Sequence, residues 1–234
     1  MKKFYSEVSI NKVNRGMEFT VTLDEISLKT PNKRLVALPS HGVAEAIASE
    51  WRRQEEFINV QEMPMTQISI TAVDIVATDI EAYRDKILSY AETDLICYRA
   101  QRPLSLVNLQ NSFWQPLVDW ASEVLESQLV VTSGVIPVKQ PVEAIKALSS
   151  YLAERDLFEL AALGLATMAS GSLIVALALS RGFINADEAF KVCSVDETWQ
   201  MKEWGTDKES VNNQEKINED LVSASRFFEL YYNS

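Results

Sequence analysis

Histidine is almost absent from this sequence, since His41 is the only one among 234 residues. A Ser-His-Asp triad, a Cys-His pair or a multi-histidine metal site would have to be built around that one residue. The two cysteines, Cys97 and Cys193, lie far apart and lack the paired spacing of a zinc or redox site. The seven glycines form neither a GxGxxG pattern nor a phosphate-binding loop followed by Gly-Lys-Ser/Thr. We therefore expect no metal, no cofactor and no catalytic residue.

Positive charge is also scarce, because 22 Lys and Arg stand against 33 Asp and Glu, for a formal net charge of −11. Such a charge repels nucleic-acid phosphates and anionic lipid headgroups. We expect no nucleic-acid partner. The acidic surface could complement a basic protein client, or it could be a solvated surface with no partner. Charge alone leaves both readings open.

One long apolar segment, residues 157–180, carries a single charge at Glu159 and is long enough to cross a bilayer. The small polar break Ser170-Gly171-Ser172 divides it into two stretches that are each too short to span. We therefore predict two buried helices and no membrane insertion, with a membrane span as the alternative. The opening residues Met1–Tyr5 resemble neither a signal peptide nor a transit sequence, so we expect a cytoplasmic or already processed form.

The hydrophobic pattern changes its period near residue 39. Residues 4–38 alternate between apolar and polar positions, and turn residues interrupt them, which predicts about four short antiparallel strands. After Pro39-Ser40 the apolar residues recur at spacings of three and four, which predicts helices. We predict an α+β protein with a small N-terminal antiparallel β domain ending in a helix, residues 1–60. A larger, mainly α-helical domain, residues 61–234, follows it.

A well-marked helix start is predicted near Ala186. Asn185 and Glu188 have the spacing of a capping box, and Gly205 can end the same helix. Asp196 and Glu197 fall inside it, but successive helical residues project about 100° apart, so this pair does not form a convergent catalytic dyad. Another helix is expected behind Asp207.

Glu197 is the acid that most needs an explanation. It falls on one helical stripe with Phe190, Cys193 and Trp204, an apolar neighbourhood in which an ionised carboxylate needs a partner. That partner could be an internal arginine such as Arg99 or a group on another protein. Trp199 and Trp204 could likewise belong to the core or to a binding surface.

Several segments together resemble the assembly chaperones that escort the alpha subunit of the F(1) sector of F-type ATP synthases. The matching stretches are Leu28-Lys-Thr-Pro31, Glu50-Trp51-Arg-Arg-Gln54, Met63-Pro-Met-Thr66, Thr93-Asp94-Leu-Ile-Cys-Tyr-Arg99-Ala100, Gly171-Ser172-Leu, and Val195-Asp196-Glu197 leading through Trp199-Gln200 to Trp204-Gly205. Two departures stand out. Glu25 replaces the turn glycine expected after Asp24, and Asn213 replaces an arginine expected soon after Glu209.

This resemblance implies a chaperone that binds unassembled alpha subunit and prevents its aggregation until it pairs with beta. It implies a protein that is not an enzyme, with the two-domain fold described above and a functional role for Asp196 and Glu197. Trp199, Trp204, Asp94 and Arg99 lie in the same matching stretches and complete our set of candidate client-binding or functionally critical residues. We expect a soluble monomer when free, in the cytoplasm of a bacterium or, for eukaryotic relatives, in the mitochondrial matrix.

Two other functions remain open from the sequence. One is a small-molecule enzyme that uses Asp94, Arg99 and Glu197 in an acidic cleft between the two domains. The other is a structural subunit that stays in the assembled complex. A deep polar cleft in which those three side chains converge would favour the enzyme.

Overall fold

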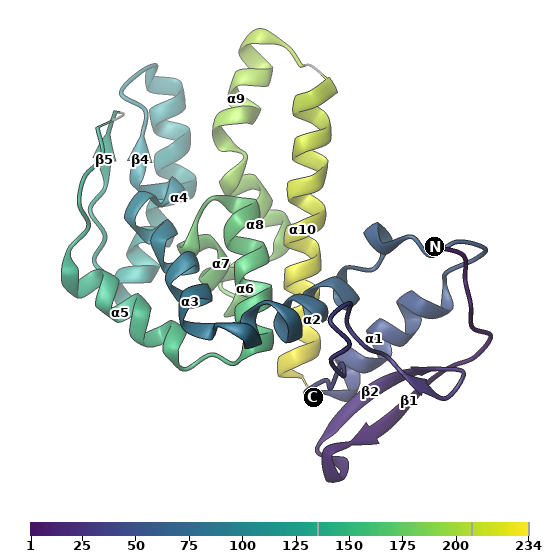
Figure 1. Cartoon of the computed structure of the whole chain (residues 1–234). Coiled ribbons are helices and arrows are strands. Elements are labelled where there is room, and N and C mark those ends of the chain that lie inside the picture. Colours follow the sequence, from purple (N-terminus) through teal and green to yellow (C-terminus); the bar gives the residue numbers. More distant parts are fainter. Residues whose placement is uncertain (135, 207, 234) are drawn as a thin grey trace. The chain divides into compact units, whose positions relative to one another are not determined.

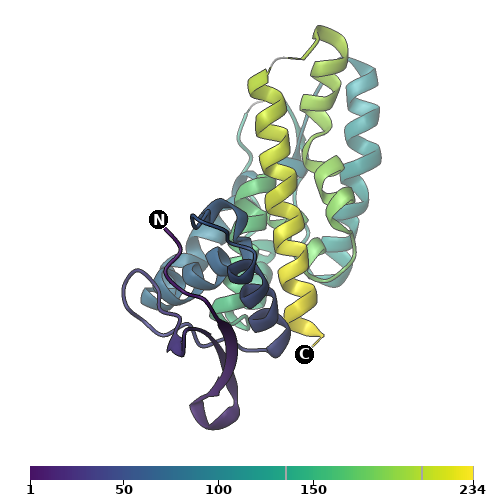
Figure 2. The same ribbon diagram turned by 90° about the vertical axis from the view of Figure 1, so that its right-hand side faces the viewer.

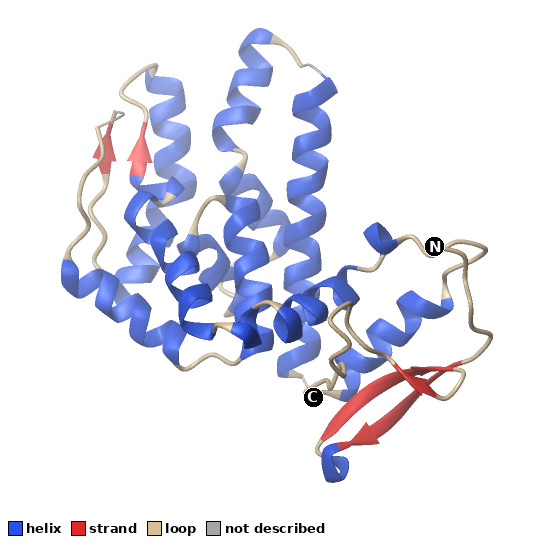
Figure 3. Cartoon of the chain, viewed as in Figure 1, coloured by secondary structure: helices blue, strands red, loops and turns tan. Residues whose placement is uncertain are grey.

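The structure is a computed structural model that describes residues 1–134, 136–206 and 208–233. It has a small N-terminal antiparallel sheet followed by helices, which confirms the predicted fold class (Figure 3). The chain forms two compact units. The first unit holds Met1–Ile80 with Leu157–Ala162 and Arg226–Ser234, and the second holds Glu81–Asp156 with Leu163–Ser225. The expected domain boundary after residue 60 stays a prediction.

The sheet of the first unit contains β1 (Val8–Val13), β2 (Glu18–Leu23) and β3 (Ile26–Ser27) in that order, all antiparallel. A turn at Asn14–Gly16 joins β1 to β2. The fourth strand that we expected is reduced to isolated bridges, one of which joins Phe19 to Leu38.

Two helices complete the N-terminal part of the first unit. Helix α1 (His41–Arg52) begins directly after Pro39-Ser40, where the change of pattern predicted a helix, and Ser40 Oγ caps it by accepting a hydrogen bond from the Val43 amide. It packs against β1, β2 and helix α2 (Pro64–Asp74). Trp51 of α1 is only 8% exposed and belongs to the core of this unit.

The second unit is built from helices around α7. The helices that follow α2 along the chain are α3 (Ile80–Leu88), α4 (Leu104–Val124), α5 (Val142–Ala153), α6 (Leu157–Ser170), α7 (Leu173–Ser180), α8 (Ala186–Cys193), α9 (Val195–Trp204) and α10 (Lys208–Tyr232). Short parallel strands β4 (Tyr98–Arg99) and β5 (Thr132–Ser133) pair beside them. Helices α4, α8 and α9 pack together, and α9 lies next to the part of α10 that belongs to this unit (Figures 1 and 2).

The long apolar segment forms two helices, as predicted. Helix α6 ends at Ser170, Gly171 adopts a φ of +69°, and Ser172 caps α7 by accepting from the Val175 amide. Every residue of α7 is buried. Within the described residues, none of the helices is long and apolar enough to cross a membrane.

The helix predicted from Ala186 to Gly205 is interrupted, so that prediction was wrong in one respect. The capping box of Asn185 and Glu188 is present, and Gly205 follows the last helical residue at a φ of +91°. Between these ends, however, Ser194 separates α8 from α9, and its hydroxyl donates to the Phe190 carbonyl. A side-chain hydroxyl that bonds back to a helix carbonyl competes with the backbone ladder. Asp207, the expected start of the terminal helix, lies outside the described residues.

The turn between β2 and β3 adopts a left-handed conformation without glycine. Asp24 has a φ of +47° and Glu25 a φ of +70°, the signs required by a two-residue hairpin turn. Asp24 also accepts hydrogen bonds from the amides of Ser6 and Glu7, at 3.0 and 2.8 Å, which orders the turn. Glu25 is exposed and makes no such contact in the described chain.

We therefore predict that Glu25→Gly raises the free energy of unfolding by about 0.5–1 kcal/mol, because glycine removes the steric cost of the positive φ. Urea denaturation measures the change. Glu25→Ala is the matched control, since it removes the carboxylate and keeps the strain. Equal stabilisation by both substitutions would show that charge, and not backbone conformation, limits this turn.

Candidate functional site

Helix α9 carries four of the six candidate residues. Asp196 is half-buried, and its Oδ1 accepts a hydrogen bond of 2.6 Å from Gln110 Nε2 on α4. Gln110 is itself buried, and its Oε1 accepts from the Ala100 amide at 2.7 Å. Asp196 is therefore fixed against α4 and the end of β4, which holds the N-terminal turn of α9 in place.

Glu197 is exposed, so its carboxylate does not need the partner that the prediction required, although Trp204, one of its predicted neighbours, lines the same hollow. In the part of the chain that the structure describes, no ion pair joins Arg99 to Glu197, and one guanidinium nitrogen of Arg99 donates to Asn111 Oδ1 on α4. The Glu197 carboxylate is thus accessible to a group outside the chain.

Trp204 is 76% exposed at the C-terminal end of α9, so the core alternative was wrong for this residue. Its ring meets the half-buried ring of Trp199 edge to face, with centroids 5.7 Å apart. Beside it lies a hollow of about 380 Å³. The residues lining that hollow are Glu197, Gln200, Met201, Trp204, Gly205, Thr206 and Ser210. We call Glu197, Trp199, Trp204 and this hollow the α9 surface.

Asp94 lies elsewhere in the same unit and is fully buried. Its carboxylate accepts hydrogen bonds from the Ile96 amide at 3.3 Å and from the Ile174 amide at 3.1 Å. Burial raises the pKa of Asp94 to about 6, against hydrogen bonds from Ser172, Ile174 and Ile96 that act in the opposite direction. Because Ile174 belongs to the first turn of α7, Asp94 stabilises the positive end of that helix's dipole.

The enzyme alternative required Asp94, Arg99 and Glu197 to converge. All three lie in the second unit, but each has different surroundings: Asp94 binds the start of α7, Arg99 bonds to Asn111, and Glu197 is exposed. Burial raises the pKa of both cysteine thiols to about 12, so these thiols stay protonated near neutral pH. Among the described residues, no group of three or more His, Cys, Asp and Glu could hold a metal ion.

The sequence analysis missed the role of Glu50. It lies in the last turn of α1 and is buried, and its carboxylate accepts hydrogen bonds from the Met65 and Thr66 amides at 2.7 and 2.9 Å. Glu50 thereby caps α2 across 15 residues of sequence, and burial raises its pKa. Glu50 and Thr66 each lie in a stretch through which the sequence resembles its family, and this was the only hint of their role. The sequence alone does not show that the two stretches meet in the fold.

A comparison with known proteins decides the family. Residues 2–122 match the model of the family described as ATP12 chaperone protein. The chain belongs to the ATP12 chaperone family. The mitochondrial protein atp12 of Schizosaccharomyces pombe is 24% identical over 237 residues, covering 95% of this chain and 81% of the yeast protein.

Crystal structures of similar proteins agree with this membership. Atp12 from Paracoccus denitrificans is 36% identical and superposes with a TM-score of 0.93 over 98% of both chains. The Atu1473 protein of Agrobacterium tumefaciens is also 36% identical, with a TM-score of 0.92 over 97% of this chain and 85% of its own. The family predicted from the matching stretches is confirmed.

The buried carboxyl group of Asp94 predicts a pH dependence of stability. Its folded-state pKa of about 6 lies above the ordinary value of 3.8, so the folded protein holds this proton more tightly than the unfolded chain does. The part of the stability that depends on the Asp94 proton is complete at low pH and is lost as the pH rises from about 4 to about 6. We expect the free energy of unfolding of the wild type, minus that of Asp94→Asn, to fall over this range and to level off above it.

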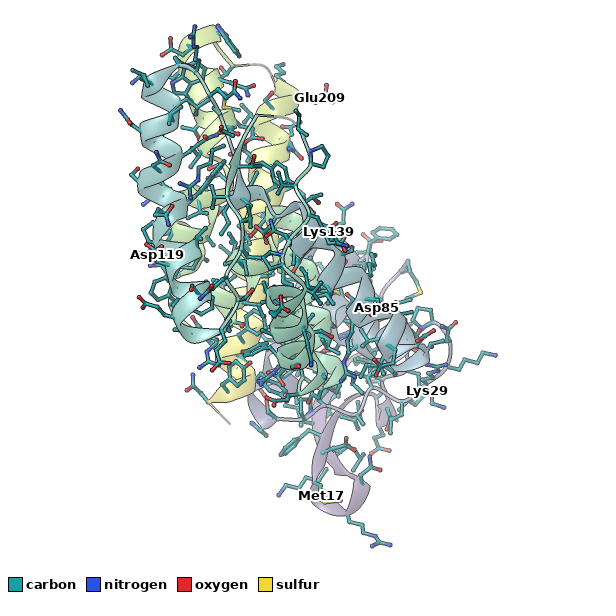
Figure 4. The ribbon with its side chains drawn as sticks, turned by 90° about the vertical axis from the view of Figure 1, so that its left-hand side faces the viewer. Met17, Lys29, Asp85, Asp119, Lys139 and Glu209 are labelled. Atoms are coloured by element: carbon teal, nitrogen blue, oxygen red, sulfur yellow. The ribbon has the colours of Figure 1, made fainter. Side chains whose placement is uncertain are left out.

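Urea denaturation at a series of pH values measures this difference. The control is Asp85→Asn, which changes a carboxyl group on the exposed side of α3 (Figure 4). The prediction is contradicted if the free energy of unfolding of the wild type, minus that of Asp94→Asn, rises with pH. Such a rise would show that the hydrogen bonds to the carboxylate lower its pKa by more than burial raises it.

Proposed function

We propose that this member of the ATP12 chaperone family serves the assembly of the F-type ATP synthase catalytic sector. It binds unassembled alpha subunit and prevents its aggregation until alpha pairs with beta. Membership of the family carries the assembly role, and the exposed Trp204 beside Glu197 and an open hollow supports the choice of contact surface. Tryptophan is enriched among the residues that contribute most to binding between proteins.

The α9 surface supplies the contacts in this proposal. Trp204 would insert against apolar side chains of the client, and Trp199 would support its ring from the side. Glu197 would pair with a cationic group of the client, which the net charge of −11 would also attract over a distance. Asp196 would act as a positioning residue through its hydrogen bond to Gln110.

Asp94 and Arg99 act indirectly in this proposal. Asp94 is fully buried and cannot touch a client, so we assign it to the stability of α7. Arg99 joins β4 to α4 through Asn111, next to the Gln110 that holds Asp196. Substitutions at these two positions should therefore lower stability before they change client binding.

The proposed mechanism is a holding action that needs no hydrolysis. The chaperone covers an apolar client surface that would otherwise self-associate, and binding lowers the concentration of the free, aggregating species. Release follows when the incoming beta subunit binds the same client surface with a lower free energy. The chaperone acts as a monomer, without catalytic residues, in the bacterial cytoplasm or the mitochondrial matrix where alpha subunit is assembled.

Aggregation of the client tests the proposal. Denatured alpha subunit is diluted into nucleotide-free buffer with and without the chaperone, and light scattering is recorded together with size-exclusion chromatography. We expect the wild type to suppress scattering and to co-elute with alpha subunit. Unchanged scattering with no complex would overturn the proposed function.

Substitutions on the α9 surface locate the contact. We expect Trp204→Ala to weaken the complex by about 2 kcal/mol, and Glu197→Lys to weaken it about tenfold, because the new lysine repels a cationic partner. Both side chains are exposed, so the urea midpoint should not change. Glu123→Lys, at an exposed position of α4, is the matched charge control. A Glu197→Lys variant that still protects the client fully would exclude Glu197 from the contact.

A further inference from the structure

A second and larger hollow lies in the same unit, away from the α9 surface. Its volume is about 740 Å³, and it lies between the end of α3, the extended residues 137–140 and α5. Its apolar lining comes from Leu88, Pro137, Val138, Val142 and Ile145. Val142 is 66% exposed although it is aliphatic and begins a helix. We call this hollow the α5 groove.

Two lysines make the α5 groove unusual on so acidic a chain. Lys139 and Lys146 both line it, against a single acidic residue, Glu92. Both lysines are exposed, and Lys139 reaches the surface from the extended segment (Figure 4). Neither ammonium group makes an ion pair within the described residues, whereas Lys216 on α10 pairs with Asp220 at 2.7 Å. The groove is thus a locally positive, apolar site on a protein with a net charge of −11.

The chemistry of the lining restricts what can occupy it. Aliphatic walls favour apolar side chains, and unpaired lysines at the rim favour carboxylates beside them. Strand addition is unfavourable along this edge, because Pro137 has no backbone N–H to donate. Recognition must therefore come from side chains, as it does when an amphipathic helix lies in a groove.

We propose that the α5 groove binds an acidic amphipathic helix of a partner protein. The apolar face of the helix lies against Val138, Val142 and Ile145, and flanking carboxylates pair with Lys139 and Lys146. This binding site is separate from the α9 surface, with which the groove shares no lining residue. It does not depend on the identity of the client in the proposed function.

The probe is a fluorescein-labelled synthetic helix of about four turns, with leucines on one face and glutamates flanking them. A matched peptide carries lysines in place of the glutamates. Fluorescence anisotropy with the full chain should show that the acidic peptide binds at least about tenfold more tightly than the basic one. A chain of net charge −11 would give the opposite preference if only its overall charge acted.

Charge reversal makes the test specific to the groove. The double variant Lys139→Glu with Lys146→Glu should invert the preference between the two peptides. The control is Lys29→Glu with Lys191→Glu, which changes the net charge equally at two exposed positions outside the groove and should keep the preference. Val142→Asp should weaken both peptides, and urea midpoints report whether each variant is folded.

Three results would overturn the inference. The first is that the acidic peptide binds no more tightly than the basic one. The second is an unchanged preference in the groove double variant. The third is that dodecanoate, a fatty acid used as a small-molecule probe, binds the chain while neither peptide does. The last would reassign the groove to a small amphipathic acid. None of these measurements uses alpha subunit, so failure here is distinguishable from failure of the proposed function.

Discussion

The helical unit depends on the hydrogen bonds that the side chain of Asp94 accepts from backbone amides. Helix α7 is buried along its whole length, so the amides of its first turn cannot be satisfied by water. Asp94 supplies one acceptor to the Ile174 amide, and Ser172 supplies another to the Val175 amide. Helices α4 and α8 pack against α7, and Trp114 of α4 donates to the Val192 carbonyl of α8 at 2.8 Å. Loss of the Asp94 carboxylate would therefore affect the helices that support the α9 surface.

The first unit uses the same device. Glu50 caps α2 from within α1, and Asp74 at the end of α2 accepts from Thr30 Oγ1 at 2.7 Å. Glu50 lies within one of the stretches through which the chain resembles its family, and Asp74 binds Thr30, which lies within another. Most of the resemblance consequently lies in residues that hold helices together, and α9 is the exception because its side chains reach solvent. A family signature of this kind identifies the fold more directly than it identifies a binding surface.

Local features could be predicted from the sequence because their causes are local. The cap at Ser40, the capping box at Asn185 and the break at Gly171 depend on neighbouring residues, and all three are present. The interruption at Ser194 has a local cause, the hydrogen bond from its hydroxyl to the Phe190 carbonyl, but a serine inside a helical pattern does not show which bond it makes. The exposure of Trp204 could not be predicted, because it depends on which face of α9 packs against α4. The α5 groove was missed for a similar reason, since segments from residues 88 to 149 meet only in the folded unit.

Hydrogen exchange measured by mass spectrometry, on the free chaperone and on its complex with alpha subunit, tests the central role of α9. We expect amides in residues 197–206 to become protected in the complex, while those in 173–180 stay slowly exchanging in both states, since α7 is buried throughout. A stable complex that leaves residues 197–206 unprotected would contradict the assignment of client binding to the α9 surface.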